Sequence, residues 1–217
     1  MSGESDAGDG DGAADADPDP RPTRVAVTGT PGTGKSTATA LLEDEYDVVH
    51  LNDLIKDEDD LWTERDADRD TLVADLDAVR ERLGDWTGVL DSHLSHRFAV
   101  DRVVVLRCHP ETVEERLRER GESEATAAEN AEPDEPSRAL ARKARENAES
   151  EALDVILSEA VAEHGAENVY EIDTTDRDPA AVADEIRAAI EGEREPSAGI
   201  VDFIDYISRA REDRDGK

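Results

Sequence analysis

The sequence predicts a doubly wound α/β fold in which helices cover both faces of a five-stranded parallel sheet. Short, nearly all-apolar runs rich in β-branched residues, such as 103–106, alternate with longer helix-like stretches. A second observation is the order of apolar run, glycine-rich turn and helix-like stretch over residues 25–42. The 217 residues are enough for one good-sized core, and the alternation favours a single domain over two.

The expected elements follow one another along residues 23–192, the predicted folded unit. Strands are expected at 25–27, 47–50, 88–91, 103–106 and 169–172. Helices are expected at 37–42, 72–83, 110–121, 137–164 and 179–192. Asp70 or Thr71 is the expected N-cap of the second helix and Gly84 its stop, while Pro110 begins the third and Gly121 ends it. The acidic stretch 122–136 is predicted to be a mobile surface loop.

The chain carries a net charge of -32, with 57 acidic residues against 25 basic ones. An acidic coat of this kind is typical of proteins from a salt-loaded cytoplasm, and a docking surface for a basic partner is the alternative. No broad basic face is visible, so direct sequence-specific DNA binding is not expected. The single cysteine, Cys108, excludes an internal disulfide, and no segment resembles a membrane span or signal peptide. These features indicate a cytoplasmic protein.

The two ends of the chain differ in composition from the folded unit. Residues 1–22 are acidic and of low complexity, which predicts disorder in isolation. The tail, 193–217, contains several apolar side chains and is apolar enough to dock as a helix. They are Ile200, Val201, Phe203, Ile204, Tyr206 and Ile207.

The turn Gly29–Ser36 has the spacing of a phosphate-binding loop. Its glycines let backbone N–H groups approach a polyphosphate closely, Lys35 reaches the outer phosphates, and Ser36 offers a hydroxyl to Mg²⁺. The sequence therefore predicts a site for ATP and Mg²⁺. The expected nucleotide-binding residues in the loop are Gly32, Thr33, Gly34, Lys35, Ser36 and Thr37.

Asp91 ends an apolar strand, where such a fold places the carboxylate of a Mg²⁺ shell. The alternative to this metal role is that Asp91 is simply a loop residue. His93 follows as a candidate to orient a water or sense the γ-phosphate, and a metal pair of His93 with His96 is a weak alternative. We expect Lys35, Asp91 and His93 to be the catalytic residues, with Ser36 and Asp91 at the metal.

Four arginines cluster around the fourth strand and the helix after it, where a guanidinium can clamp phosphates. They are Arg107, Arg116, Arg118 and Arg120. Arg116 and Arg118 fit better as partners of glutamates on a helix face. Arg120, beside Gly121, is the better functional candidate.

Five segments follow one another along the chain: the phosphate loop, Asn52–Lys56, Asp91-Ser92-His93, Arg107 and Leu117–Gly121. In this order they resemble the adenylate kinase isoenzyme six family, and the resemblance covers roughly Arg24–Glu191. In eukaryotes this family includes the coilin-interacting nuclear ATPase, and the acidic composition suits an archaeal, halophile-type member. The Asp-x-His after the third strand is the most specific element. Lys35-Ser36 stands where ordinary adenylate kinases have Lys-Gly.

The resemblance implies a small nucleoside monophosphate kinase with two moving segments: a monophosphate-binding segment at about 50–73 and a lid over ATP at about 119–147. It implies that Arg120 is the lid arginine that contacts ATP, that Asp91 and His93 handle Mg²⁺ and hydrolysis, and that Asp53 and Lys56 lie at the monophosphate. The chain departs from the family at Asn52 and Lys56, where glycine and arginine are usual, and in the longer stretch 122–136.

These observations predict broad-specificity transfer of the γ-phosphoryl of ATP to AMP, together with ATPase activity. The resemblance also implies a part in late maturation of the small ribosomal subunit and its rRNA, through transient contact with a small-subunit ribosomal protein. Two alternatives stay open. One is an assembly ATPase with incidental kinase activity, and the other is a kinase for another small acceptor.

Overall fold

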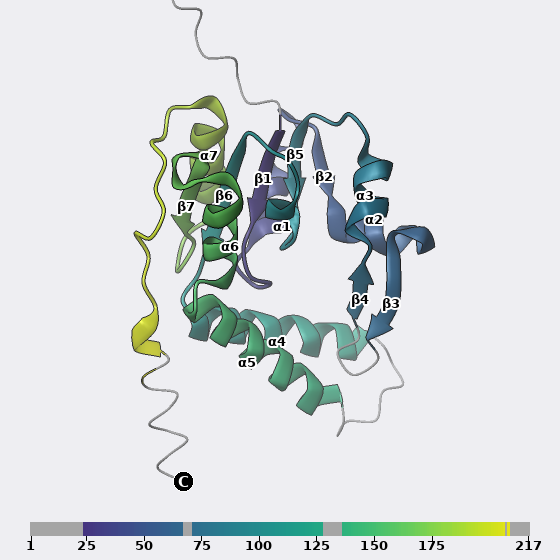
Figure 1. Ribbon diagram of the computed structural model, residues 1–217. Helices are drawn as coiled ribbons and strands as arrows, with labels where there is room; N and C mark the ends of the chain where they lie inside the picture. Colours follow the sequence, from purple (N-terminus) through teal and green to yellow (C-terminus); the bar gives the residue numbers. More distant parts are fainter. Residues whose placement is uncertain (1–23, 67–70, 128–135, 207, 209–217) are drawn as a thin grey trace, which may run out of the picture.

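A five-stranded parallel sheet forms the centre of the molecule (Figure 1). The computed structural model describes residues 24–66, 71–127, 136–206 and 208, so the expectation for residues 1–22 lies outside the described residues. The strands are β1 (Arg24–Thr28), β2 (Val48–His50), β5 (Gly88–Asp91), β6 (Arg102–Arg107) and β7 (Val169–Asp173). Their order is β2-β5-β1-β6-β7, and every pair is parallel. The predicted fold class is confirmed.

Helices cover both faces of this sheet. They are α1 (Lys35–Thr39), α2 (Leu51–Asp57), α3 (Leu76–Leu83), α4 (Pro110–Ala127), α5 (Pro136–Ala152), α6 (Val155–His164) and α7 (Pro179–Glu191). Short 3-10 turns lie at Ala40–Leu42, Asp59–Leu61, Ser95–Arg97 and Ala166–Asn168.

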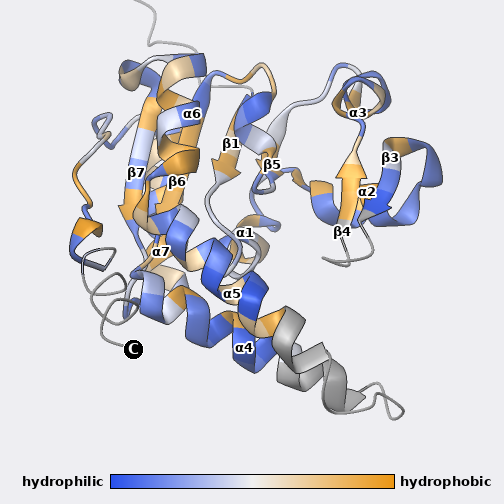
Figure 2. Cartoon of the chain, turned by 60° about the horizontal axis from the view of Figure 1, so that its bottom comes forward, coloured by the Kyte–Doolittle hydropathy of each residue, from blue (hydrophilic) through white to orange (hydrophobic). Residues whose placement is uncertain are grey.

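Alternate strand residues point to opposite faces, as the two-residue period of a strand requires. Val25 and Val27 of β1 pack with α1 and α7, whereas Ala26 packs with α6. β6 lies between both layers and is largely hydrophobic, while α4 and α5 are mostly hydrophilic (Figure 2). The core is therefore centred on β1 and β6, and α4 and α5 lie beyond the edge of the sheet at which the phosphate loop emerges.

A small antiparallel hairpin lies within the segment between β2 and β5, and the sequence did not reveal it. It consists of β3 (Trp62–Asp66) and β4 (Thr71–Ala74). The helix expected from Leu72 begins only at Leu76, so the expected caps Asp70 and Thr71 were wrong. Asp75 is the N-cap, because its side chain accepts from the backbone N–H groups of residues 77 and 78. Gly84 ends the helix as expected.

Gly121 does not end α4, which continues to Ala127. A Cβ at Gly121 would lie 2.2 Å from Leu140 of α5, so this glycine lets the two helices approach closely. The loop predicted at 122–136 is therefore wrong over 122–127 and at Pro136, which begins α5, and residues 128–135 lie outside the described residues.

The single helix expected at 137–164 is two helices, α5 and α6, separated at Leu153 and Asp154. Asp154 has a φ of 52°, in the left-handed region that interrupts a right-handed helix. Its carboxylate pairs with the buried guanidinium of Arg107. This tertiary ion pair explains why the chain turns where the amphipathic pattern continues.

The C-terminal segment returns along β7 (Figure 1). Ser197 forms a parallel bridge to Tyr170, donating its N–H to the Val169 carbonyl at 2.9 Å. Phe203 and Tyr206 then pack against α5. Within the described part of the chain, no helix combines the length and apolar character that a membrane crossing needs.

We expect Gly88→Ala to destabilise the fold by about 3 kcal/mol or more, because Gly88 has a φ of 101° and its new Cβ would lie 2.2 Å from the Asp47 carbonyl oxygen. Chemical denaturation at fixed salt measures the loss. Gly192→Ala is the control: it is also left-handed, but only a flexible arginine end lies near, so about 1 kcal/mol is expected. Equal losses would contradict this account.

Candidate functional site

The loop between β1 and α1 is shaped by contacts with the rest of the fold. Gly29 and Gly32 have φ values of 141° and 98°. A Cβ at Gly29 would lie 2.3 Å from the Leu106 carbonyl oxygen, and one at Gly32 would lie 3.2 Å from Val113 of α4. The glycines therefore allow close approach to β6 and α4 as well as an open cradle of backbone N–H groups.

Lys35, the first residue of α1, reaches back across the loop. Its Nζ donates to the carbonyl oxygens of Gly29 at 2.7 Å and Thr30 at 3.0 Å. Burial lowers the pKa of Lys35 to about 8, while the carboxylates of Asp91 and Glu151 oppose that shift. The ammonium group is therefore held inside the loop, still mainly charged at neutral pH.

Asp91 lies beside this loop because its strand, β5, pairs directly with β1, with Val27 opposite Asp91. The side chain is 3% exposed. Its Oδ2 lies 2.8 Å from Nδ1 of His50, while the buried Oδ1 has no hydrogen-bond partner in the described part of the chain. A buried carboxylate oxygen needs a donor or a cation, so this oxygen fits the water shell of a Mg²⁺ ion. Ser36 is exposed at the start of α1, where its hydroxyl is accessible.

His50 belongs to this site, and the sequence reasoning missed it. It ends β2 opposite Asp91 and bridges the carboxylates of Asp91 and Glu43, with Nε2 3.0 Å from Glu43 Oε1. Burial opposes its charge, but its hydrogen bonds to the carboxylates of Glu43 and Asp91 outweigh burial and raise the pKa of His50. The available signal was its place at the carboxyl end of a strand next to β5.

His93 is half-buried, and Lys35 lies near enough for its charge to act on the imidazole. Burial and the nearby charge of Lys35 lower the pKa of His93 to about 4, so its imidazole is neutral at pH 7. His96 does not pair with it at a metal. Its Nδ1 lies 3.0 Å from Thr28 Oγ1 and its Nε2 lies 2.9 Å from Glu159 Oε2. Among the described residues no cluster of three or more His, Cys, Asp or Glu forms a metal site.

The four arginines separate into different roles. Arg116, which the sequence placed on a helix face, lies against the loop with Nη1 3.4 Å from the Gly32 carbonyl oxygen. Arg118 pairs with Glu114 on the exposed face of α4, as expected. Arg120 is exposed on the same helix, close enough that its charge lowers the pKa of Lys35, after burial as the main cause. Arg107 is 1% exposed and bound by carboxylates, so a phosphate-clamping role for it is wrong.

Asp53 and Lys56 lie on α2, outside the cluster around the loop. They pair with each other at 3.7 Å, and both side chains are more than two-thirds exposed. A different α2 residue connects to the Asp91–His93 turn: Asn52 Oδ1 accepts from Ser92 Oγ at 3.0 Å. This hydrogen bond connects α2 to the turn after β5.

Comparisons with known proteins agree with this geometry. A family model described as an AAA domain matches residues 25–136. A protein of Natronomonas pharaonis named "Putative adenylate kinase" is 55% identical over 178 residues, covering 82% of this chain and 95% of the relative. Proteins of the same name from Halobacterium salinarum and Pyrococcus abyssi are 54% and 40% identical, covering 82% and 80% of this chain and 95% and 87% of the relatives.

The chain belongs to this adenylate kinase-like family. The part that the family model matches includes the phosphate loop, Asp91 and α4 with Arg116 and Arg120. It ends at residue 136, so α5 and the C-terminal segment lie beyond it.

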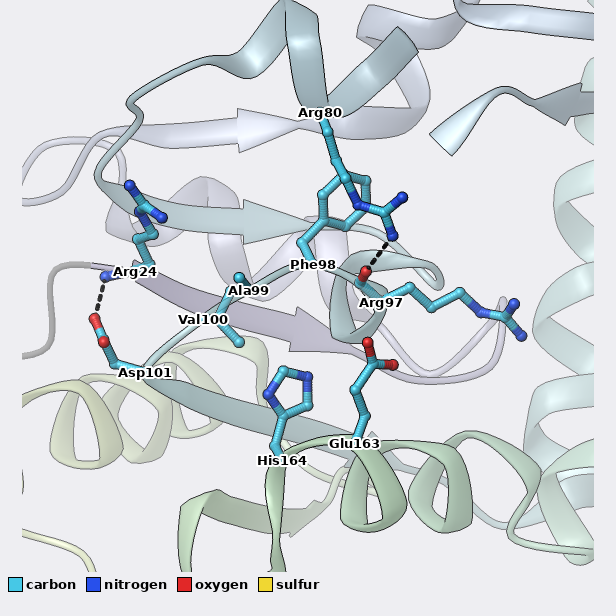
Figure 3. Close-up of a pocket in the computed structure, with 9 residues that line it drawn as sticks. All are labelled: Arg24, Arg80, Arg97, Phe98, Ala99, Val100, Asp101, Glu163 and His164. Carbon is cyan, nitrogen blue, oxygen red and sulfur yellow. Dashed lines mark hydrogen bonds between the residues drawn. The ribbon is translucent and has the colours of Figure 1, made fainter. Parts of the chain in front are cut away.

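A hollow of about 700 Å³ lies elsewhere in this adenylate kinase-like protein, at the amino end of β1 (Figure 3). Arg24, Arg80 and Arg97 line it, and Figure 3 shows Arg80 donating to the Arg97 carbonyl and extending beside the Phe98 ring. Acidic side chains line it too, Asp101 and Glu163 among them. Because the loop leaves β1 at the opposite, carboxyl end, this hollow is separate from the candidate nucleotide site.

Proposed function

We propose that this protein is a broad-specificity nucleoside monophosphate kinase that transfers the γ-phosphoryl group of ATP to AMP, giving two ADP. The observation that supports it best is that Lys35 and Asp91 are both buried beside a phosphate-binding loop, where Asp91 Oδ1 has no hydrogen-bond partner among the described residues. The adenylate kinase names of the relatives agree with this activity.

Each group in the loop has a task in this proposal. The backbone of Gly32–Thr37 surrounds the phosphates, and Lys35 moves its donors from the loop carbonyls to the outer phosphates. Ser36 and Asp91 hold the Mg²⁺, which when bound neutralises phosphate charge. A phosphate oxygen of AMP bonds to the γ-phosphorus while the bond to the β–γ bridging oxygen breaks, leaving ADP on both sides.

The moving parts are assigned from the family resemblance and from where the elements lie. Residues 50–73, with Asp53 and Lys56, receive the monophosphate. Residues 119–147, whose described parts belong to α4 and α5, form the lid that brings Arg120 onto ATP and excludes water. Arg116 acts from the loop side of α4, where its guanidinium already lies beside Gly32.

A second candidate is an ATPase that assists maturation of the small ribosomal subunit. The neutral imidazole of His93 beside Lys35 is suited to orient a water molecule, and the net charge of -32 suits a basic ribosomal protein as partner. A pull-down of small-subunit proteins with and without ATP tests it. Absence of any nucleotide-dependent ribosomal partner would remove this candidate. A kinase for another small acceptor is the third candidate, and a screen of phosphoryl acceptors tests it.

We expect the purified protein in molar salt to form ADP from ATP plus AMP, and Lys35→Met to lower the rate by about 100-fold through loss of charge at the transferring phosphoryl group. A coupled assay that compares ATP alone with ATP plus each monophosphate measures this. If neither protein forms ADP, the kinase proposal fails.

Arg116→Ala is expected to raise the KM for ATP about 10-fold, because it removes a charged donor beside the loop. Arg118→Ala is the matched control, two residues away on the same helix but paired outward with Glu114. It should leave KM unchanged. Equal effects of the two variants would contradict the role given to Arg116.

His93→Gln separates the two candidate activities. If His93 orients water, hydrolysis of ATP alone should fall about 10-fold while transfer to AMP persists. Parallel assays with and without AMP measure both rates. A loss of transfer with hydrolysis retained would contradict this role.

A further inference from the structure

Arg107 is the centre of a buried ionic cluster that the proposed chemistry does not use. Its Nε donates to Glu151 Oε1 at 2.7 Å, its Nη1 donates to Glu171 Oε1 at 2.5 Å, and its Nη2 bonds to Asp154. Arg107, Glu151 and Glu171 are at most 3% exposed. Charges so fully removed from water are tolerated only when paired, so these side chains have little freedom to move independently.

Glu151 connects this cluster to the phosphate loop. Its Oε2 accepts a hydrogen bond of 2.5 Å from the Thr30 hydroxyl, which is itself 2% exposed. The carbonyl oxygen of the same Thr30 accepts from Lys35 Nζ. The position of Thr30, and with it the loop that holds the lysine, therefore depends on where Glu151 lies.

Glu151 also lies near the C-terminus of α5, the helix whose earlier part, up to residue 147, belongs to the proposed lid segment. At the C-terminus of α5, the Glu151 carbonyl oxygen accepts from Arg107 Nη2 at 3.1 Å and also from the Asp154 N–H at 3.1 Å. Because α5 packs along α4, this contact anchors the pair of helices at one end (Figure 1). The phosphate loop and the C-terminus of α5 are thus both held by hydrogen bonds of Glu151.

The C-terminal segment completes the cluster from the other side. The N–H groups of Ile200 and Val201 donate to Glu171 Oε2 at 2.7 and 3.3 Å. The Arg107 guanidinium lies over the Phe203 ring, with Cζ 5.5 Å from the ring centroid. The Phe203 ring also meets the His109 ring edge-on. Tyr206 packs on Ala148 and Ala152 of α5. This segment therefore covers the cluster and contacts both of its glutamate-bearing elements, β7 and α5.

We infer that Glu151 is a positioning residue for the phosphate loop, acting through Thr30, and that the C-terminal segment Ser197–Tyr206 holds Glu151 in place through Glu171 and Arg107. The inference rests on the proposed kinase function for its activity readout. It gives the C-terminal segment a part in phosphoryl transfer although that segment lies outside the residues that the family model matches.

The first test removes only the bond between the loop and Glu151. Thr30→Val replaces the hydroxyl by a methyl group and leaves the Arg107 cluster intact, and we expect kcat to fall about 10-fold through misplacement of Lys35. Thr30→Ser keeps a hydroxyl and should restore at least half of the wild-type kcat. If Thr30→Val keeps the wild-type kcat, the inference is overturned.

The second test asks whether the C-terminal segment acts through the same bond. Phe203→Ala uncovers Arg107 and should lower kcat several-fold, whereas Ile204→Ala, at a side chain 58% exposed, should not. The double variant Thr30→Val with Phe203→Ala should be no slower than Thr30→Val alone, because both changes break one path. Independent, multiplying losses would overturn the coupling.

Amide hydrogen exchange of residues 29–36 separates this inference from the proposed function. Exchange should be faster in Thr30→Val and Phe203→Ala and unchanged in Ile204→Ala, whether or not the protein transfers a phosphoryl group. If the wild-type protein transfers no phosphoryl group but the variants show this exchange pattern, the kinase proposal fails and the positioning role is supported. Unchanged exchange in Thr30→Val sinks the positioning role alone.

Discussion

The parallel pairing of β2, β5 and β1 is the constraint on which the site depends. Parallel strands end at the same edge of a sheet, so the residues after each strand meet although they are far apart in sequence. His50, Asp91 and the phosphate loop are brought together in this way. Each lies at the carboxyl end of its strand, and the register places His50 and Val27 opposite Asp91. Any shift in this register would separate the carboxylate from the lysine.

Electrostatics differ sharply between the surface and the interior of this protein. The surplus of acidic residues gives the molecule its net charge, whereas among the described residues only a few charged side chains are buried, and they have specific partners. Burial of Lys35 depresses its pKa, which disfavours the charged form. The carboxylates of Asp91 and Glu151 oppose this shift and favour the charged form. The interior thus holds charge only where paired groups fix its position, which is the requirement of a site that handles phosphates.

Two threonines attach the phosphate loop to the rest of the molecule. Thr30 donates to Glu151 on α5, and Thr174, after β7, donates to the Thr33 carbonyl oxygen at 2.9 Å. The loop is therefore held from α5 and from the sheet by groups distant in sequence. A loop fixed in this way enters binding with little conformational entropy left to lose.

The sequence by itself determined the strands, the phosphate loop and the position of Asp91, because apolar periodicity, glycine spacing and strand ends are local signals. It did not determine the break between α5 and α6 at Asp154, the hairpin β3–β4, or the partners of Arg107 and Arg116. Each of these depends on a partner distant along the chain: Glu151 and Glu171 bury Arg107, Gly32 lies beside Arg116, and Arg107 binds Asp154. Arg107 ends an apolar strand and Arg116 lies among glutamates on a helix, but neither local sequence shows the partner, because packing alone brings the carboxylates to Arg107 and Gly32 to Arg116.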